Sequence, residues 1–209
     1  MKMNLPNKLT VLRLIMVPIF MAVMLLPAFA NFTPAVDTTL TISGVLLFIA
    51  ASFTDMLDGK IARKYNLVTD FGKFLDPLAD KFLVIGAMLC ILFANFASGN
   101  ITMATIYFVA LVVVVFRELA VTSIRLVASS SGGVVIAANM LGKAKTVTQI
   151  IAICAAIIEP LIYSALGITD WPSLYPPITF VTTTIMTILT IISGINYITG
   201  AWKYLDPQK

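Results

Sequence analysis

Four aspartates lie close together in a sequence that is otherwise strongly apolar. They are Asp55, Asp58, Asp76 and Asp80, and small residues and one arginine complete the spacing D-x2-D-G-x2-A-R-x8-G-x3-D-x3-D. Carboxylate oxygens are the ligands that Mg²⁺ and Mn²⁺ prefer, whereas zinc sites favour nitrogen and sulfur. Four carboxylates supply enough oxygens for two ions, an arrangement suited to phosphoryl transfer. The residue types therefore predict a site for two divalent cations, Mg²⁺ or Mn²⁺.

The absence of histidine narrows the chemistry further. None of the 209 residues is a histidine, so imidazole serves neither as a metal ligand nor as a general base. Proton transfer must then fall to carboxylates, lysines or tyrosines. Cys90 and Cys154 lie in apolar runs without C-x2-C spacing, and we expect them to be packing residues.

The acids belong to a chain with the composition of a membrane protein. Hydrophobic residues make up 59% and charged residues 11% of it, and the mean hydropathy is +0.99. A helix needs about 20 mostly apolar residues to cross a bilayer. Six runs qualify: 9–30, 39–62, 73–96, 101–128, 140–163 and 176–202. The sequence predicts an all-α polytopic membrane protein with six transmembrane helices, forming a single domain over residues 1–209.

Lysines and arginines are distributed unevenly between the two ends of these runs. They occur at the termini and in or beside the second and fourth connections: Lys2, Lys8, Lys60, Arg63, Lys64, Lys73, Arg125, Lys143, Lys145, Lys203 and Lys209. The other connections hold Asp37, Glu159 and Asp170 but no basic residue. The positive-inside rule therefore predicts that both termini are cytoplasmic. The net charge of +4 reflects this topology and attraction to anionic lipid, and we expect no nucleic-acid binding.

The first run also has features of a cleaved signal peptide. Lys2 and Lys8 precede it, and Ala28–Phe29–Ala30 matches an A-x-A cleavage site. Arg13 and Pro18 interrupt the run, which is long for the apolar part of a signal peptide. We therefore expect the segment to remain as the first transmembrane helix.

Helical periodicity groups the four aspartates into two faces. Residues three or four apart share a helix face, so Asp55 pairs with Asp58 and Asp76 with Asp80. A short connection separates the second and third runs, and we expect antiparallel neighbours whose acidic faces meet. Alternatively, the acids pair with nearby basic residues, namely Lys60, Arg63, Lys64, Lys73 and Lys81. Four acids in this spacing favour bound cations instead.

Small residues and a proline accompany the acids. Gly59, Ala62 and Gly72 leave room for a ligand near the backbone, and Arg63 is suited to a bidentate phosphate contact. Pro77 either bends the third helix or marks its true start.

This spacing resembles the signature of the CDP-alcohol phosphatidyltransferase family at every position. The resemblance implies a six-helix membrane fold, usually homodimeric, with a polar cavity that opens to the cytoplasm. It also implies two divalent ions on the pyrophosphate of a CDP-linked lipid. Carried onto this sequence, Asp55, Asp58 and Asp76 are metal ligands, and Asp80 is both a ligand and the general base. The nucleotide site would be formed by Asp58, Gly59, Ala62, Arg63 and Gly72.

A second cluster of polar residues indicates which kind of alcohol accepts the transferred phosphatidyl group. Arg117 and Glu118 interrupt the fourth run, and Arg125, Lys143 and Lys145 lie toward the same side. A buried arginine in a membrane helix is expensive, so Arg117 is expected to bind an anion or to pair with an acid. A cationic pocket beside the acidic one suits an acceptor that itself carries phosphate.

Three stretches resemble bacterial members of the family whose acceptor is sn-glycerol 3-phosphate. They are Asn4–Leu14, Phe116–Val127 and Ala137–Ile150. The resemblance implies CDP-diacylglycerol as donor, a bacterial cytoplasmic membrane, and an acceptor phosphate held by Arg117, Arg125 and Lys143. It also implies that Asn7, Thr10 and Arg13 line the entrance of the site. The alternative for these three is a helix start with a membrane anchor.

Other functions remain open at this level. A sister enzyme with inositol phosphate as acceptor satisfies the same cations, whereas serine leaves them little to bind. An ion-coupled transporter needs polar groups along a path to both faces. The strongly placed charges here gather toward the predicted cytoplasmic side, which favours an enzyme over a transporter or a membrane scaffold.

Overall fold

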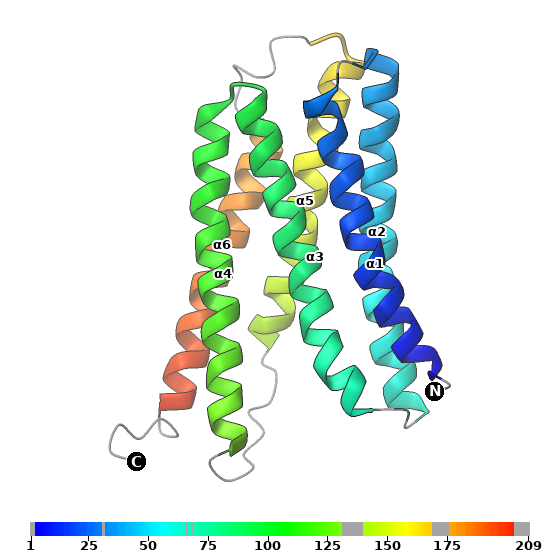
Figure 1. Ribbon diagram of the computed structural model, residues 1–209. Coiled ribbons are helices and arrows are strands. Elements are labelled where there is room, and N and C mark those ends of the chain that lie inside the picture. The colour runs from blue at the N-terminus through cyan, green and yellow to red at the C-terminus, as the bar shows by residue number, and fades with distance from the viewer. Residues whose placement is uncertain are drawn as a thin grey trace.

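The protein is an all-helical bundle (Figure 1). The structure, a computed structural model, describes residues 3–30, 32–65, 67, 69–130, 140–168 and 176–202, with the backbone alone at 63 and 128–130. This part of the chain forms α1 Leu5–Phe29, α2 Pro34–Lys64, α3 Asp70–Ala97, α4 Ile101–Ser130, α5 Met140–Ala165 and α6 Pro177–Ala201. All six helices are long and apolar enough to cross a membrane. The predicted fold class is confirmed.

Polar caps and prolines determine where several helices begin. The Asn4 side chain accepts a hydrogen bond from the Asn7 N–H at the start of α1, and Thr69 caps α3 in the same way. Helix α2 begins with Pro34, at a position where a helix needs no backbone donor. Pro77 lies inside α3, so it does not mark the start of that helix.

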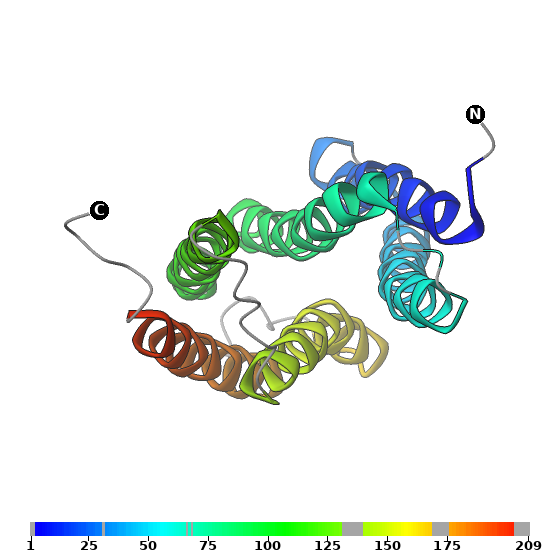
Figure 2. The same ribbon diagram turned by 90° about the horizontal axis from the view of Figure 1, so that it is seen from below.

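The six helices close into a ring when the molecule is seen from below (Figure 2). Around the ring, contacts follow the order α1, α2, α5, α6, α4, α3 and back to α1, and α3 also touches α5 across it. Helices α1, α3 and α5 begin at the lower end of Figure 1, where α2, α4 and α6 end. We call this the lower end of the bundle.

Helix α1 lies against both α2 and α3. The short connection predicted that α2 and α3 would be close neighbours with facing acidic stripes. In the structure these two helices touch each other far less than each touches α1. The two acidic faces nevertheless meet, because Asp58 interacts electrostatically with Asp76 and Asp80 interacts with Asp55. The predicted meeting of the faces is confirmed, with Thr10 of α1 between Asp58 and Asp76.

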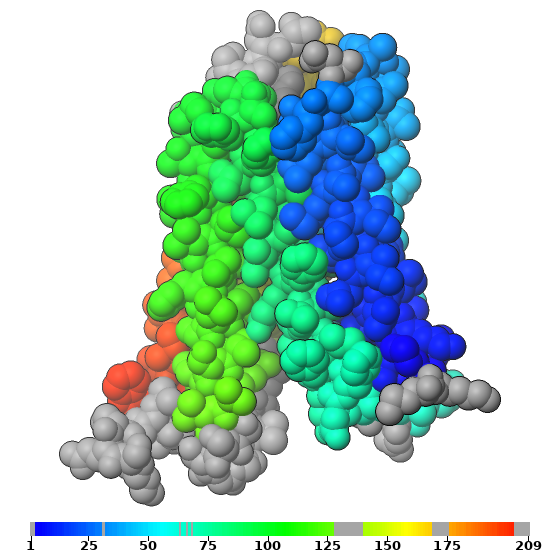
Figure 3. Space-filling view, in the orientation of Figure 1, coloured from blue at the N-terminus to red at the C-terminus, as the bar shows by residue number. Residues whose placement is uncertain are grey.

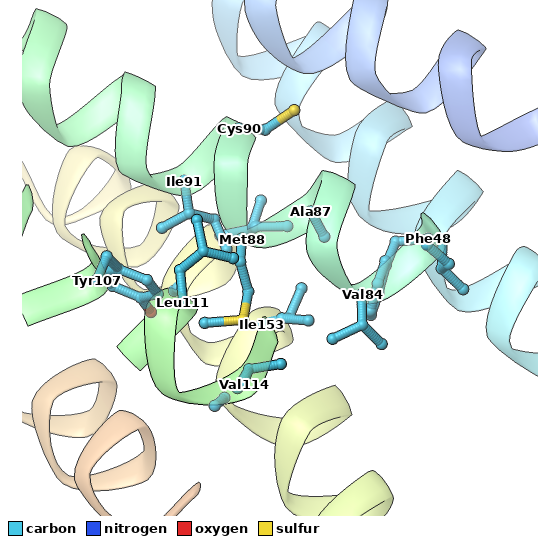
Figure 4. Close-up of a cluster of buried hydrophobic side chains, with 14 of the residues drawn as sticks. Phe48, Val84, Ala87, Met88, Cys90, Ile91, Tyr107, Leu111, Val114 and Ile153 are labelled. Atoms are coloured by element: carbon cyan, nitrogen blue, oxygen red, sulfur yellow. The ribbon is translucent and has the colours of Figure 1, made fainter. Parts of the chain in front are cut away.

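The upper part of the ring is filled by apolar side chains from several helices. Figure 4 shows Phe48 of α2 and Ile153 of α5 around a central group from α3 and α4. That group comprises Val84, Ala87, Met88, Cys90, Ile91, Tyr107, Leu111 and Val114. Cys90 is buried and both Cys90 and Cys154 are free thiols, which agrees with their predicted role in packing.

Large apolar side chains also cover the outside of the bundle. Phe74 and Phe116 are each 70% exposed, and Leu119 is 62% exposed. A soluble monomer rarely exposes so much contiguous apolar surface, whereas a bilayer solvates it. The chain is an integral membrane protein. Lys2, Lys203, Lys209 and Asp170, which contribute to the predicted sidedness, lie outside the described residues.

Glu159 of α5 caps the upper end of α6. Its carboxylate accepts hydrogen bonds from the backbone N–H groups of Ile178 and Thr179, at 3.1 and 2.6 Å, and from the Tyr163 hydroxyl. Pro176, at the N-cap of α6, supplies no side-chain cap. Glu159, which lies on a neighbouring helix, therefore takes the place of a local cap. Its negative charge suits the N-terminus of α6.

We expect Glu159→Ala to destabilise the protein by roughly 2–3 kcal/mol, because it leaves buried N–H groups without an acceptor. Thermal denaturation in detergent measures this change. Ser164→Ala, on an exposed position of the same helix, is the matched control. Equal melting temperatures for the two variants would remove Glu159 from the capping role.

Candidate active site

A cavity of about 800 Å³ opens at the lower end of the bundle. Its acidic side is formed by Asp55 of α2 and by Asp76 and Asp80 of α3. Its basic side is formed by residues of α3, α4 and α5: Lys81, Arg117, Arg125, Lys143 and Lys145. Figure 3 shows the surface indented at this end, between the start of α3 and the end of α4. The structure thus brings the two predicted polar groups around one space.

A polar stripe on α1 runs along the acidic side. Asn4, at the N-cap, and Asn7, Thr10 and Arg13 recur every three residues, so each neighbours the next along a stripe that winds around the helix. The side chains of Asn7, Thr10 and Arg13 are buried, at 7%, 1% and 0% exposure. Asn4 Nδ2 donates to the Leu67 carbonyl at 2.8 Å. This stripe attaches α1 to the start of α3 and lies behind the cavity wall.

Arg13 joins the two acids of α2. Its Nη1 contacts Asp55 and its Nη2 contacts Asp58, so one guanidinium bridges both carboxylates. Asp58 is buried and does not line the cavity, whereas the Asp55 side chain is 40% exposed and does. A fully buried arginine is tolerated because two opposite charges compensate it.

Thr10 and Asn7 connect the same stripe to α3. Thr10 Oγ1 donates to Asp76 Oδ1 at 2.7 Å and lies 3.4 Å from Asp58 Oδ2. The Thr69 hydroxyl donates to Asn7 Oδ1 at 3.0 Å. Three of the four motif aspartates therefore have partners on α1.

Asp80 differs from the other three aspartates. It forms no hydrogen bond or ion pair with another described residue, and it lines the cavity. It interacts electrostatically with Asp55 on the acidic side and with Lys145 and Glu118 on the basic side. Asp80 thus lies between the two halves of the cavity, with its carboxylate available to a ligand.

The four aspartates suit divalent cations by ligand type, since all are carboxylates and the chain has no histidine. Within the described ranges, however, no three acidic or thiol side chains are grouped closely enough to hold one ion. Arg13 and Thr10 hold three of the four acids. These contacts engage one oxygen of each carboxylate, namely Asp55 Oδ1, Asp58 Oδ2 and Asp76 Oδ1.

The small residues of the motif have different surroundings. A Cβ on Gly72 would lie 3.0 Å from Asn7 Oδ1 and 3.3 Å from Thr69 Oγ1, so the glycine permits the close approach of α1. The space that we expected for a ligand at Gly72 is filled by these side chains. Gly59 and Ala62 are half-buried on α2 and do not line the cavity. The side chain of Arg63 lies outside the described part of the chain.

The basic side is organised by Glu118. Its Oε1 accepts from Arg117 Nη1 at 3.0 Å and also from Lys145 Nζ. Arg117 Nη2 donates to Ser193 Oγ on α6 at 2.9 Å. The expectation that Arg117 binds an anion or pairs with an acid is met within the chain by Glu118.

Other cations surround this buried group. Arg125 donates to the Tyr197 hydroxyl at 3.2 Å and lies over the tyrosine ring. Lys143 is exposed at the cavity wall, and Lys81 contacts Thr122. In the part of the chain that is described, the ion pairs of the four motif aspartates are with Arg13, and Lys73 pairs with Asp70. The structure therefore does not support the alternative in which neighbouring lysines pair with the motif aspartates.

Sequence reasoning did not select several residues of this site. Lys145 is 5% exposed and contacts Glu118, yet Lys143 was chosen as the phosphate ligand. Ser193 and Gly194 of α6 are both buried against Arg117. Lys145 and Gln149 lie four residues apart and share the buried face of α5.

The fold and the motif define a membrane-embedded transferase of nucleotide-linked alcohols. The chain belongs to the CDP-alcohol phosphatidyltransferase family, whose model matches residues 3–195. It is 40% identical to the CDP-diacylglycerol–glycerol-3-phosphate 3-phosphatidyltransferase of Bacillus subtilis (strain 168), over 205 residues and 97% of each chain.

Two further relatives carry the same name. The protein of Wigglesworthia glossinidia brevipalpis is 33% identical and 98% of each chain is covered. The protein of Escherichia coli (strain K12) is 32% identical over 164 residues, which cover 78% of this chain and 81% of that protein.

We expect Arg13→Met to destabilise the protein by roughly 3–5 kcal/mol, because it leaves the buried Asp58 carboxylate without its ion-pair partner. The double variant Arg13→Met/Asp55→Asn is expected to lose less than the sum of the two single variants, as measured by denaturation in detergent. Lys73→Met is the control, since the Lys73 and Asp70 side chains are 64% and 98% exposed and such pairs contribute little. Additive losses for Arg13 and Asp55 would contradict the bridge.

Proposed function

We propose that this enzyme transfers the phosphatidyl group of CDP-diacylglycerol to sn-glycerol 3-phosphate. The products are phosphatidylglycerophosphate, a precursor of phosphatidylglycerol and cardiolipin, and CMP. The observation that carries the proposal is one cavity, lined by three aspartates of the motif, by the half-buried Arg117 and by the buried Lys145. The names of the related proteins support the same reaction.

The acidic side is proposed to bind the donor. Enzymes of this family generally depend on divalent metal ions. Asp55, Asp58, Asp76 and Asp80 would hold two such ions, Mg²⁺ or Mn²⁺. When bound, the ions would neutralise charge on the diphosphate and make CMP a better leaving group. Gly59, Ala62, Arg63 and Gly72 are proposed as neighbours of the nucleotide because they complete the family's motif.

The basic side is proposed to bind the acceptor phosphate. Arg117, Arg125, Lys143 and Lys145 all line it, and a guanidinium group is well shaped for a phosphate. The acceptor hydroxyl would then lie toward Asp80, between the two halves of the cavity. Asp80 takes the proton from this hydroxyl, whose oxygen attacks the lipid-linked phosphorus as the bond to CMP breaks.

The membrane arrangement completes the proposal. The diacylglycerol part stays in the bilayer while CMP leaves through the lower end of the bundle. Lys8 and Arg125 lie at that end, which agrees with a cytoplasmic location of both termini in a bacterial cytoplasmic membrane. We also propose a homodimer, as is usual in the family.

Detergent-solubilised protein is expected to release CMP from CDP-diacylglycerol when sn-glycerol 3-phosphate and Mg²⁺ or Mn²⁺ are present. A chelator should abolish release, and added metal should restore it. Serine is expected to give no turnover, because it has no phosphate for the basic side. Turnover with inositol phosphate, and not with sn-glycerol 3-phosphate, would identify a different acceptor and leave the proposed chemistry unchanged. No release with any acceptor, from folded protein, would contradict the proposed function.

Asp80→Asn is expected to lower turnover by about 10²-fold or more, because an amide cannot accept the hydroxyl proton. The melting temperature should stay close to that of the unaltered protein, since Asp80 pairs with no other described side chain. Asp70→Asn, at an exposed position at the start of α3, is the control and should retain full activity. Near-normal turnover of Asp80→Asn would assign the base to another group.

A further inference from the structure

Glu118 is an unexpected residue at the wall of an anion-binding cavity. A carboxylate there lowers the positive charge that attracts an acceptor phosphate. Glu118 is nevertheless 9% exposed and lines the same cavity as Arg117 and Lys145. Both cations donate to its Oε1 atom. The acid therefore has a role that outweighs its unfavourable charge.

That role is visible in how Lys145 is held. A lysine side chain has four flexible carbons and loses considerable rotamer freedom when it binds a ligand. Lys145 lies on α5 and Glu118 on α4, two helices without extensive contact of their own. Their ion pair spans the ring and fixes the ammonium group against one wall, so much of this freedom is lost before a ligand arrives.

Arg117 is held from a second direction by α6. Its Nη2 donates to Ser193 Oγ at 2.9 Å. The adjacent Gly194 lies against the arginine stem, since a Cβ at this position would be 3.2 Å from Arg117 Cγ. Glu118 and Ser193 therefore fix the guanidinium by two hydrogen bonds, while its Nε makes none with a described residue.

We propose that Glu118 is a positioning residue for acceptor binding. With Ser193 and Gly194, it fixes Arg117 and Lys145 so that their remaining N–H groups face the acceptor phosphate. This inference rests on the proposed function, because it concerns the phosphate of the same acceptor. It adds a negative residue and two small residues of α6 to a site otherwise described by its cations.

Because Glu118 is charged, one substitution can distinguish positioning of the cations from electrostatic attraction of the acceptor phosphate. Glu118→Gln adds one unit of net positive charge to the basic side. If attraction alone governed binding, the KM for sn-glycerol 3-phosphate would fall. If positioning governs binding, the KM rises although the charge has become more favourable, because a neutral amide oxygen holds the two cations more weakly than a carboxylate does.

The test is the steady-state release of CMP, with each substrate varied in turn at saturating levels of the other. For Glu118→Gln we expect the KM for sn-glycerol 3-phosphate to rise about tenfold or more. The KM for CDP-diacylglycerol and kcat at saturating acceptor should change less than about threefold. Ser193→Ala and Gly194→Ala keep every charge and should raise the acceptor KM about threefold. Asp70→Asn is the control for removing an acid elsewhere and should match the unaltered protein.

The outcomes distinguish this inference from the proposed function. If the unaltered protein releases no CMP in response to sn-glycerol 3-phosphate, the proposed function itself is contradicted. Normal activity of that protein, with an unchanged or lowered acceptor KM in Glu118→Gln, would overturn the positioning role alone. If Glu118→Gln does not fold, as judged by its melting curve, the two α6 variants decide. A normal acceptor KM in both of them would overturn the proposal.

Discussion

A guanidinium group buried between two carboxylates holds the first helices together at the lower end of the bundle. Arg13 is fully buried, and only its two contacts with Asp55 and Asp58 make that burial tolerable in apolar surroundings. The same helix face carries Thr10, which donates to Asp76 on α3. The positions of the acidic residues therefore depend on α1 as much as on the helices that carry them.

The cavity combines two walls of opposite charge, and each wall is built differently. On the acidic side, α1 supplies the compensating groups from outside the motif. On the basic side, Glu118 supplies an acid within the group of cations. In both places the charge that defines the wall is accompanied by a single residue of opposite sign. Asp80 lies between the walls and pairs with no other described residue, which suits a group that must exchange a proton.

Much of this arrangement could be predicted from the sequence. Apolar runs of sufficient length gave all six helices, and the spacing of the aspartates indicated the acidic site, because both signals are local. The partners of those aspartates were not predictable in the same way. The contact of Thr10 with Asp76 joins residues 66 positions apart, and Ser193 meets Arg117 across 76 positions. Such contacts depend on the order of helices around the ring, which short connections do not determine.

The bridge made by Arg13 also bears on how the chain enters the membrane. Both of its partners lie on α2, so the positive charge of Arg13 is compensated inside the hairpin of α1 and α2. Ionised side chains are costly to insert into a bilayer one at a time. The charge of Arg13 is compensated within the first two helices, without any side chain from the four helices that follow.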